Sequence, residues 1–282
     1  TAGYGGASDG DKPFHLYGSI STDAATVNQN VNKYAVHYGG DYAESGYEAL
    51  WQIVKGDDRS VAQASYDGTT LPYCTPAAGT WGCAGFRKRA LPVVIHITDA
   101  HSHDINYVPY NSSYVKNPHY SDVVHPAYQN KGARVISIYR NSSQLDQLVA
   151  TSKKTNAVVP VCAFKNASNQ WKCGTDMCCL TDGGVAPTDD NKCVLSYGKS
   201  DATKLNETIV DGVDALVKYG TYKVATRIRG EAIGNGKNTG CFIDKVVATA
   251  YVRPPAEPEK SCNPVATVGR IAVDGSTPAY NN

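Results

Sequence analysis

The stretch Leu91-Pro-Val-Val-Ile-His-Ile-Thr98 (LPVVIHIT) decides the fold class of this 282-residue chain. Its apolar residues run on without alternation and are rich in β-branched side chains, which is typical of a strand buried on both faces of a parallel sheet. A second run of this kind is Ala133–Tyr139 (ARVISIY). Segments with helical spacing of apolar residues flank both runs. The sequence therefore predicts an α/β fold with a doubly wound, mostly parallel sheet, similar to a Rossmann fold.

The remaining elements follow from apolar spacing and from helix-capping residues. Further strands are predicted at Phe14–Ile20, Ala157–Ala163 and Tyr222–Ile228. Helices are predicted after Ser21-Thr22-Asp23 as far as Gly39-Gly40, and at Asp41–Lys55, Asp122–Asn130, Ser143–Lys154 and Leu205–Tyr219. Residues 56–90, 99–120 and 164–202 are expected to be loops. We expect residues 1–229 to form the α/β domain and residues 230–282 to form a small appendage of short antiparallel β-strands.

Composition excludes some classes of function. Lys and Arg number 27 and Asp and Glu number 26, so the net charge of +1 does not suit a protein that binds nucleic acid through a positive field. No apolar run approaches the roughly 20 residues that span a membrane as a helix. Nine cysteines in loop-like surroundings indicate disulfides, and therefore an exported, extracellular or cell-surface protein.

The cysteines suggest two local disulfide pairs, Cys74–Cys83 and Cys241–Cys262. The pairing of the others remains open, and the odd total leaves one cysteine without a partner in this chain; they are Cys162, Cys173, Cys178, Cys179 and Cys193. Four Asn-x-Ser/Thr sequences are candidate glycosylation sites in a glycosylating host, at Asn111, Asn141, Asn166 and Asn206.

Two polar segments are candidates for a functional site. One is Thr98–Asp104 (TDAHSHD), which follows the first buried strand, and the carboxyl ends of parallel strands are where ligands bind in this fold class. The other is Gly39–Gly46 (GGDYAESG), which holds two acids at the start of a predicted helix. Simpler interpretations remain open, since Asp99 could cap a turn and acids favour the first turn of a helix. A zinc site at His101, His103 and Asp104 is a weaker alternative.

Together the two segments resemble the von Willebrand factor A domain, in the branch of integrin β-subunit I-like domains and secreted bacterial A-domain proteins. The first segment reads Asp41-Tyr42-Ala43-Glu44-Ser45-Gly46, continuing to Gln52, and is similar to a D-x-P-E-x-G pattern with Ala43 in place of Pro. The second, Thr98–His103, is similar to T-D-(A/D)-x-x-H. The resemblance extends over roughly residues 9–229.

The resemblance implies a metal-ion-dependent adhesion site. Glu44 and Asp99 would help to hold Mg²⁺ (or Ca²⁺), Asp41 would match a flanking Ca²⁺ position, and a partner's carboxylate would displace a metal-bound water. Hard cations take oxygen ligands, which agrees with these residues. The family's D-x-S-x-S motif should lie before residue 14 and is not in this chain. We therefore expect the chain to be part of a longer protein, lacking the first strand, helix and second strand of the family and truncated at its end.

The sequence thus predicts a secreted or surface protein that binds a partner protein offering a carboxylate, rather than an enzyme. A hydrolase is disfavoured because no nucleophile elbow or complete metal triad is present. The alternative is a structural subunit that self-assembles into an extracellular filament and uses the fold as a scaffold without a working metal. Tyrosines expected near the binding face suit either function; they are Tyr107, Tyr110, Tyr114, Tyr120 and Tyr128.

Overall fold

The fold is described from a computed structural model. Up to residue 219 it describes residues 12–34, 42–88, 90–139, 145–166, 168–172, 176–178, 185, 187–188, 191–198 and 205–219. Beyond that point it describes the short segments 232–233, 237–238, 271–273 and 277–279.

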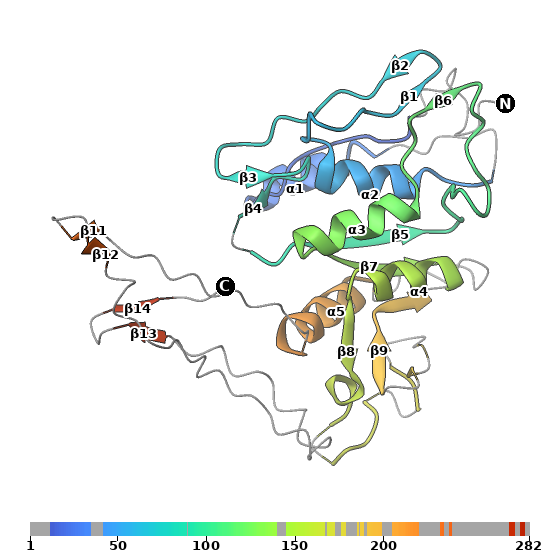
Figure 1. The fold of residues 1–282 in the computed structure, drawn as a ribbon. Helices are drawn as coiled ribbons and strands as arrows, with labels where there is room; N and C mark the ends of the chain where they lie inside the picture. The colour runs from blue at the N-terminus through green and yellow to red at the C-terminus, as the bar shows by residue number, and fades with distance from the viewer. Residues whose placement is uncertain are drawn as a thin grey trace.

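A parallel sheet lies at the centre of the molecule (Figure 1). It contains β5 (Val93–Thr98), β7 (Arg134–Tyr139) and β10 (Ser196–Gly198) in the order β10-β7-β5. β5 and β7 pair over six residues, from Val93 opposite Arg134 to Thr98 opposite Tyr139. The two apolar runs of the sequence are therefore neighbouring parallel strands, and the α/β class is confirmed.

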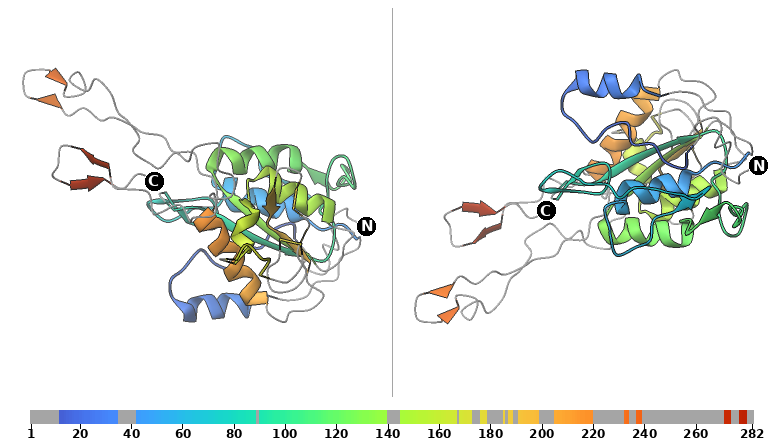
Figure 2. Two further views of the ribbon diagram at one scale, coloured as in Figure 1. Left: turned by 90° about the horizontal axis from the view of Figure 1, so that it is seen from below. Right: turned by 90° about the horizontal axis from the view of Figure 1, so that it is seen from above.

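Helices pack on this sheet from both sides (Figures 1 and 2). α2 (Gly46–Lys55) and α3 (Ser121–Lys131) pack on one face of the sheet, against side chains that include Val94 and Val135. α4 (Leu145–Lys154) lies on the same side, because the Ser137 hydroxyl donates to the Leu148 carbonyl. α5 (Leu205–Tyr219) packs on the opposite face, where its Leu216 joins the cluster that includes Ile136. Successive residues of a strand point to opposite faces, so each cluster covers one face.

Local sequence explains where several helices begin and end. Asp23 caps α1 (Ala24–Val31) by accepting the backbone N–H groups of Ala25 and Thr26, as predicted. α3 ends at Gly132, whose φ of 67° is the left-handed conformation that glycine adopts readily. α5 has the bounds that the sequence predicts.

Two helix predictions were wrong at their ends. α1 stops at Val31 instead of continuing toward Gly39, and none of its residues is buried, so no packing extends it. α2 begins at Gly46 instead of Asp41, because the segment before it pairs with another part of the chain. The predicted strand Phe14–Ile20 is also wrong: that segment has no ladder partner among the described residues, although the Ile20 N–H donates to the Ala84 carbonyl.

The expected loop after α2 contains short hairpins. β3 (Thr80–Trp81) pairs with β4 (Phe86–Arg87), and a small sheet joins β2 (Thr69–Thr70), β1 (Ser65–Tyr66) and β6 (Val115–Lys116). The predicted disulfide Cys74–Cys83 is present. It closes the loop that leads from the end of α2 to β3 and β4.

The second cysteine-rich segment differs from the prediction. β8 (Val158–Pro160) lies outside the parallel sheet and pairs antiparallel with β9 (Lys192–Val194), while a 3₁₀-helix follows at Val161–Phe164. β10 lies inside the stretch expected to be a loop, because its SYG sequence is too short to show periodicity. Cys178 and Cys193 form a disulfide there. Cys162 is also disulfide-bonded, and Cys173 and Cys179 lie outside the described residues.

The C-terminal part contains two antiparallel pairs of short strands. β11 (Ala232–Ile233) pairs with β12 (Lys237–Asn238), and β13 (Ile271–Val273) pairs with β14 (Thr277–Ala279). The short antiparallel strands expected here are therefore present, and the division into a domain of residues 1–229 and an appendage stays a prediction. The predicted strand Tyr222–Ile228 and the cysteines Cys241 and Cys262 lie outside the described residues.

Candidate functional site

The two polar segments singled out in the sequence meet at the C-terminal end of β5. The Glu44 N–H donates to the His101 carbonyl at 2.6 Å, and the His103 N–H donates to the Glu44 carbonyl at 2.8 Å. These bonds form a parallel bridge between Glu44 and Ser102. More than fifty residues separate the segments in sequence, so only the fold brings them together.

Gly46 is required for this contact. A Cβ atom at position 46 would lie 2.2 Å from the Ser102 hydroxyl oxygen and 3.1 Å from Nε2 of His96. Real Cβ atoms do not approach other atoms so closely, so a larger residue would force the Ser102 side chain, the His96 ring or the start of α2 to shift. The glycine in the GGDYAESG segment is therefore explained by close packing.

Of the proposed metal ligands, Glu44 takes part in this contact and Asp99 directly follows β5. The Glu44 and Asp99 side chains are exposed, and Asp41 lies outside the described residues. Contrary to expectation, Glu44 precedes α2 and is not in its first turn, so it does not act there as a helix-dipole acid. Within the described ranges, no three His, Cys, Asp or Glu side chains are grouped so that they could hold a metal ion.

Two polar side chains beside the first turn of α2 were not predicted. Ser45 is the N-cap residue of α2 but makes no side-chain cap, and its buried hydroxyl has no hydrogen-bond partner among the described residues. Nδ1 of His96, on β5, is buried and unpartnered in the same way. Burial lowers the pKa of His96 to about 4, so its ring is neutral at pH 7. The sequence hint was a histidine inside an otherwise apolar strand.

α4 holds the loop from its other side. The Gln147 side chain accepts the Ser102 N–H at 2.7 Å and donates to the Ser102 carbonyl at 3.0 Å. Both backbone groups of Ser102 are thus satisfied by one amide, which fixes the loop against the helix. Gln147 gives no sequence signal, because a polar residue on a helix is ordinarily solvent-exposed.

The histidines of this loop have structural roles that disfavour the zinc alternative. His103 is 1% exposed, its Nδ1 lies 2.8 Å from the Val108 carbonyl, and its ring packs on Tyr110 with centroids 4.1 Å apart. His101 lies between Tyr42 and Tyr107, with ring centroids 6.4 and 4.5 Å away. His103 is therefore part of the core, whereas His101 is half-buried between two exposed tyrosines.

Exposed apolar side chains border the contact. Tyr42 and Tyr107 are 64% and 57% exposed, and Ile105 and Val108 lie in the same loop as Tyr107 and are exposed too. The sequence predicts that five tyrosines lie near the binding face, and this holds only in part. Tyr114 is also exposed, but Tyr110 and Tyr128 are buried core residues. The hydroxyl of Tyr128 donates to the Leu50 carbonyl, which is why a tyrosine can be buried there.

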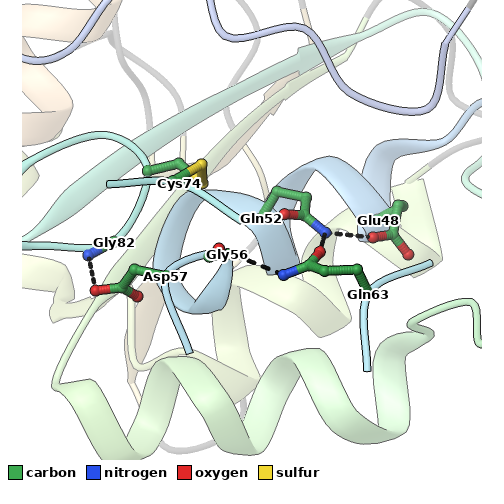
Figure 3. The surroundings of a disulfide bond; sticks show 8 residues. Glu48, Gln52, Gly56, Asp57, Gln63, Cys74 and Gly82 are labelled. Atoms are coloured by element: carbon green, nitrogen blue, oxygen red, sulfur yellow. Dashed lines mark hydrogen bonds between the residues drawn. A yellow bond between two sulfur atoms is a disulfide. The ribbon is translucent and has the colours of Figure 1, made fainter. Parts of the chain in front are cut away.

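The carboxylate of Glu48, on α2, faces inward and is held by several hydrogen bonds. Glu48 is 1% exposed; it accepts the His119 N–H at 2.9 Å, lies 3.0 Å from Nδ1 of the His119 ring, and accepts the Gln52 amide at 2.9 Å. Figure 3 shows this network continuing from Gln52 to Gln63 and from Gln63 to the Gly56 carbonyl, beside the disulfide of Cys74. The network anchors the loops on either side of β5 to α2.

The glycosylation candidates have different settings. Asn111 and Asn166 are exposed on turns, where each side-chain oxygen accepts a backbone N–H two residues ahead, and Asn206 is exposed near the start of α5. Asn141 lies outside the described residues. Their modification stays a prediction.

Comparison with known proteins identifies no relative. No protein-family model matches the chain, and no curated protein or solved structure matches it. Within the described residues, every helix is too short or too polar to cross a membrane.

Proposed function

We propose that this chain is a secreted or cell-surface protein, built as a doubly wound von Willebrand factor A-type domain, that binds a partner protein through a divalent cation. The observation that carries the proposal is the backbone bridge between Glu44 and Ser102. It brings the GGDYAESG and TDAHSHD segments to the C-terminal end of a parallel strand, where α/β proteins bind ligands.

The chemistry of the donors agrees with a hard cation. Glu44, Asp99 and Asp41 offer carboxylate oxygens, and Mg²⁺ or Ca²⁺ takes oxygen ligands. Mg²⁺ keeps several waters and is often held by one or two protein carboxylates, so an incomplete protein set is compatible with it. Exposed Glu44 and Asp99 would hold the cation, and a carboxylate on the partner would replace a water.

The extracellular location rests on the cysteines. Disulfides join Cys74 to Cys83 and Cys178 to Cys193, and such bonds persist in oxidising compartments. The exposed rim of Tyr42, Ile105, Tyr107 and Val108 would provide apolar contact area around the cation. We propose a binding role without catalysis.

Calorimetric titration of the 282-residue protein with Mg²⁺, Ca²⁺ and Mn²⁺ tests this proposal. We expect saturable binding that weakens at least about tenfold in Asp99→Ala, since a lost ligand to a bound cation costs more than an ordinary hydrogen bond. Asp211→Asn, an exposed acid on α5, is the control and should bind as the wild type does. Absence of cation binding, or equal loss in both variants, would contradict the proposal.

A scaffold subunit of an extracellular assembly is the second candidate. It is favoured by α1, which buries none of its residues and exposes Val27 and Val31 one helical turn apart. Such a helix gains stability by packing against another surface. Ordered oligomers that persist in EDTA and dissociate in Val27→Lys would support this candidate over metal-dependent adhesion.

A further inference from the structure

The backbone of residues 101–103 is hydrogen-bonded on two opposite sides. On one side, Glu44 donates its N–H to the His101 carbonyl and accepts the His103 N–H. The N–H and C=O of Ser102, the residue between them, point the other way, as in any extended chain whose alternate residues face opposite neighbours. There the Gln147 side chain accepts the Ser102 N–H at 2.7 Å and donates to the Ser102 carbonyl at 3.0 Å. The Gln147 amide therefore takes the place of a neighbouring strand.

The position of Ser102 depends on this one side chain. Ser102 is 2% exposed, so water has little access to its backbone groups. Buried N–H and C=O groups that lose their partners cost free energy until they reach another partner or water. Loss of the Gln147 amide should therefore displace the loop rather than leave it in place.

Gln147 is itself held by a buried polar contact. One helical turn later on α4, the Thr151 hydroxyl donates to the Gln147 carbonyl at 2.9 Å. The same hydroxyl oxygen lies 3.0 Å from the Tyr47 hydroxyl on α2 and 3.2 Å from Nε2 of His125 on α3. Thr151 and Tyr47 are 1% and 2% exposed, so the low dielectric around them strengthens these bonds. α4 is thus fixed to α2 and α3 close to Gln147.

These contacts form a closed circuit beside the candidate site. From Glu44 the circuit passes through the backbone of Ser102 to Gln147 on α4. It returns along α4 to Thr151 and across to Tyr47, which follows Glu44 by three residues. A displacement of α4 is therefore transmitted to the segment that carries Glu44.

Asp99 is placed by the same circuit. It lies between Thr98, the last residue of β5, and Ser102. The Thr98 hydroxyl accepts the Ala100 N–H at 3.2 Å and donates to the Ala100 carbonyl at 3.0 Å, which holds the first part of the loop on the strand. Gln147 holds the later part through Ser102. Loosening Ser102 would therefore free both Asp99 and Glu44 to move.

We propose that Gln147 is a positioning residue of the cation site: it holds Ser102 so that Glu44 and Asp99 keep the separation that binds a divalent cation. This inference rests on the proposed function. It assigns part of the cation affinity to α4, a helix that supplies none of the three proposed ligands. Because coupling is reciprocal, a bound cation in turn stabilises the contact between Ser102 and Gln147.

The test compares Gln147→Met with Gln129→Met in the whole 282-residue protein. Methionine has a similar length but offers no amide. Gln129, on α3, donates to the Lys154 carbonyl at the other end of α4 at 2.7 Å, so the control removes a bond to α4 far along the helix from the loop. In calorimetric titrations with Mg²⁺ and, separately, Ca²⁺, we expect Gln147→Met to bind at least about fivefold more weakly than the wild type. Gln129→Met should bind as the wild type does.

Amide hydrogen exchange reads the contact without any cation. In the metal-free protein, the Ser102 amide should exchange at least about fivefold faster in Gln147→Met than in the wild type or in Gln129→Met. A saturating cation should slow this exchange in the wild type. Gln147→Asn, too short by one methylene to reach both groups of Ser102, should repeat the behaviour of Gln147→Met. Far-ultraviolet circular dichroism verifies the fold of each variant.

The possible outcomes separate this inference from the function on which it rests. Cation binding that is equal in the wild type and Gln147→Met would overturn the role of Gln147 and leave the cation site standing. Equal weakening in Gln147→Met and Gln129→Met would assign the effect to general loosening of α4 and would also overturn it. A wild type that binds neither cation would overturn the proposed function, and the role of Gln147 with it.

Discussion

β7 and β5 are neighbouring strands of similar composition in different environments. β7 is buried along its whole length between β5 and β10, and its two faces are covered by α4 and α5. β5 is covered well only at Val94, has Ile97 at 53% exposure, and carries His96, whose buried Nδ1 has no hydrogen-bond partner among the described residues. The comparison teaches that a continuous apolar run identifies a strand of a parallel sheet but does not reveal how many neighbours the strand has.

The largest expected effect concerns the disulfide on the β7 side. Cys178 and Cys193 are fully buried in the cluster with Ile136, and their bond spans fifteen residues. Replacing both with alanine should lower the free energy of unfolding by about 3–5 kcal/mol. Replacing Cys74 and Cys83, which lie in a loop and span nine residues, should cost less, about 2–3 kcal/mol.

Urea unfolding of the two double variants measures this difference. Equal losses of unfolding free energy would show that the Cys74–Cys83 disulfide stabilises the protein as strongly as the buried Cys178–Cys193 disulfide does. That result would contradict the expectation that the better-buried β7 side contributes more to stability than the β5 side.

Truncating one isoleucine on each strand compares them directly. Ile136→Ala on β7 removes a side chain with 0% exposure and should cost about 3 kcal/mol, because a cavity remains in a packed core. Ile97→Ala on β5 removes a side chain that is half in solvent and should cost less than about 1 kcal/mol. Chemical denaturation of both proteins supplies the two values, and similar values would mean that the Ile97 side chain is covered in solution.

His96 makes the β5 side sensitive to acid. Its folded pKa of about 4 lies below the ordinary value of 6.5, so between these pH values the unfolded chain binds more protons than the folded one. Folding stability should therefore be complete above pH 6.5 and fall as the pH drops toward 4, by on the order of 2 kcal/mol.

Unfolding of the wild type and of His96→Gln at pH 7 and pH 4.5 isolates this contribution. Other groups titrate in both proteins, so only the difference between them counts. A wild type that loses no more stability in acid than the variant would exclude His96 as the cause.

The smallest effect is expected at Tyr197 on β10. Its hydroxyl is buried without a hydrogen-bond partner among the described residues, and burial raises its pKa well above 10. Tyr197→Phe removes an unsatisfied polar group without changing the packing, so stability should stay the same or rise by up to about 1 kcal/mol. Thermal unfolding measures it, and a clear loss of stability would reveal a partner for the hydroxyl, such as an ordered water.

Local sequence sufficed for the elements whose signals are strong and self-contained. The β5 and β7 runs, the amphipathic α5, the Asp23 cap and the Cys74–Cys83 pair were all predicted, because each depends on residues close together in the chain. β10 was missed and Phe14–Ile20 was wrongly assigned, because strands exist through partners that local periodicity cannot identify.

The sequence by itself determined the α/β class, the parallel pair of apolar strands and the two acidic segments that we expected to share a site. Only the tertiary structure decided that these segments meet through Glu44 and Ser102, that Glu48 is buried on His119, and that β5 pairs with β7 alone among the strands of the described residues. The physical reason is that periodicity and capping act over a few residues. Neighbours in a sheet, buried carboxylates and close contacts such as that of Gly46 arise between segments that meet only when the chain folds.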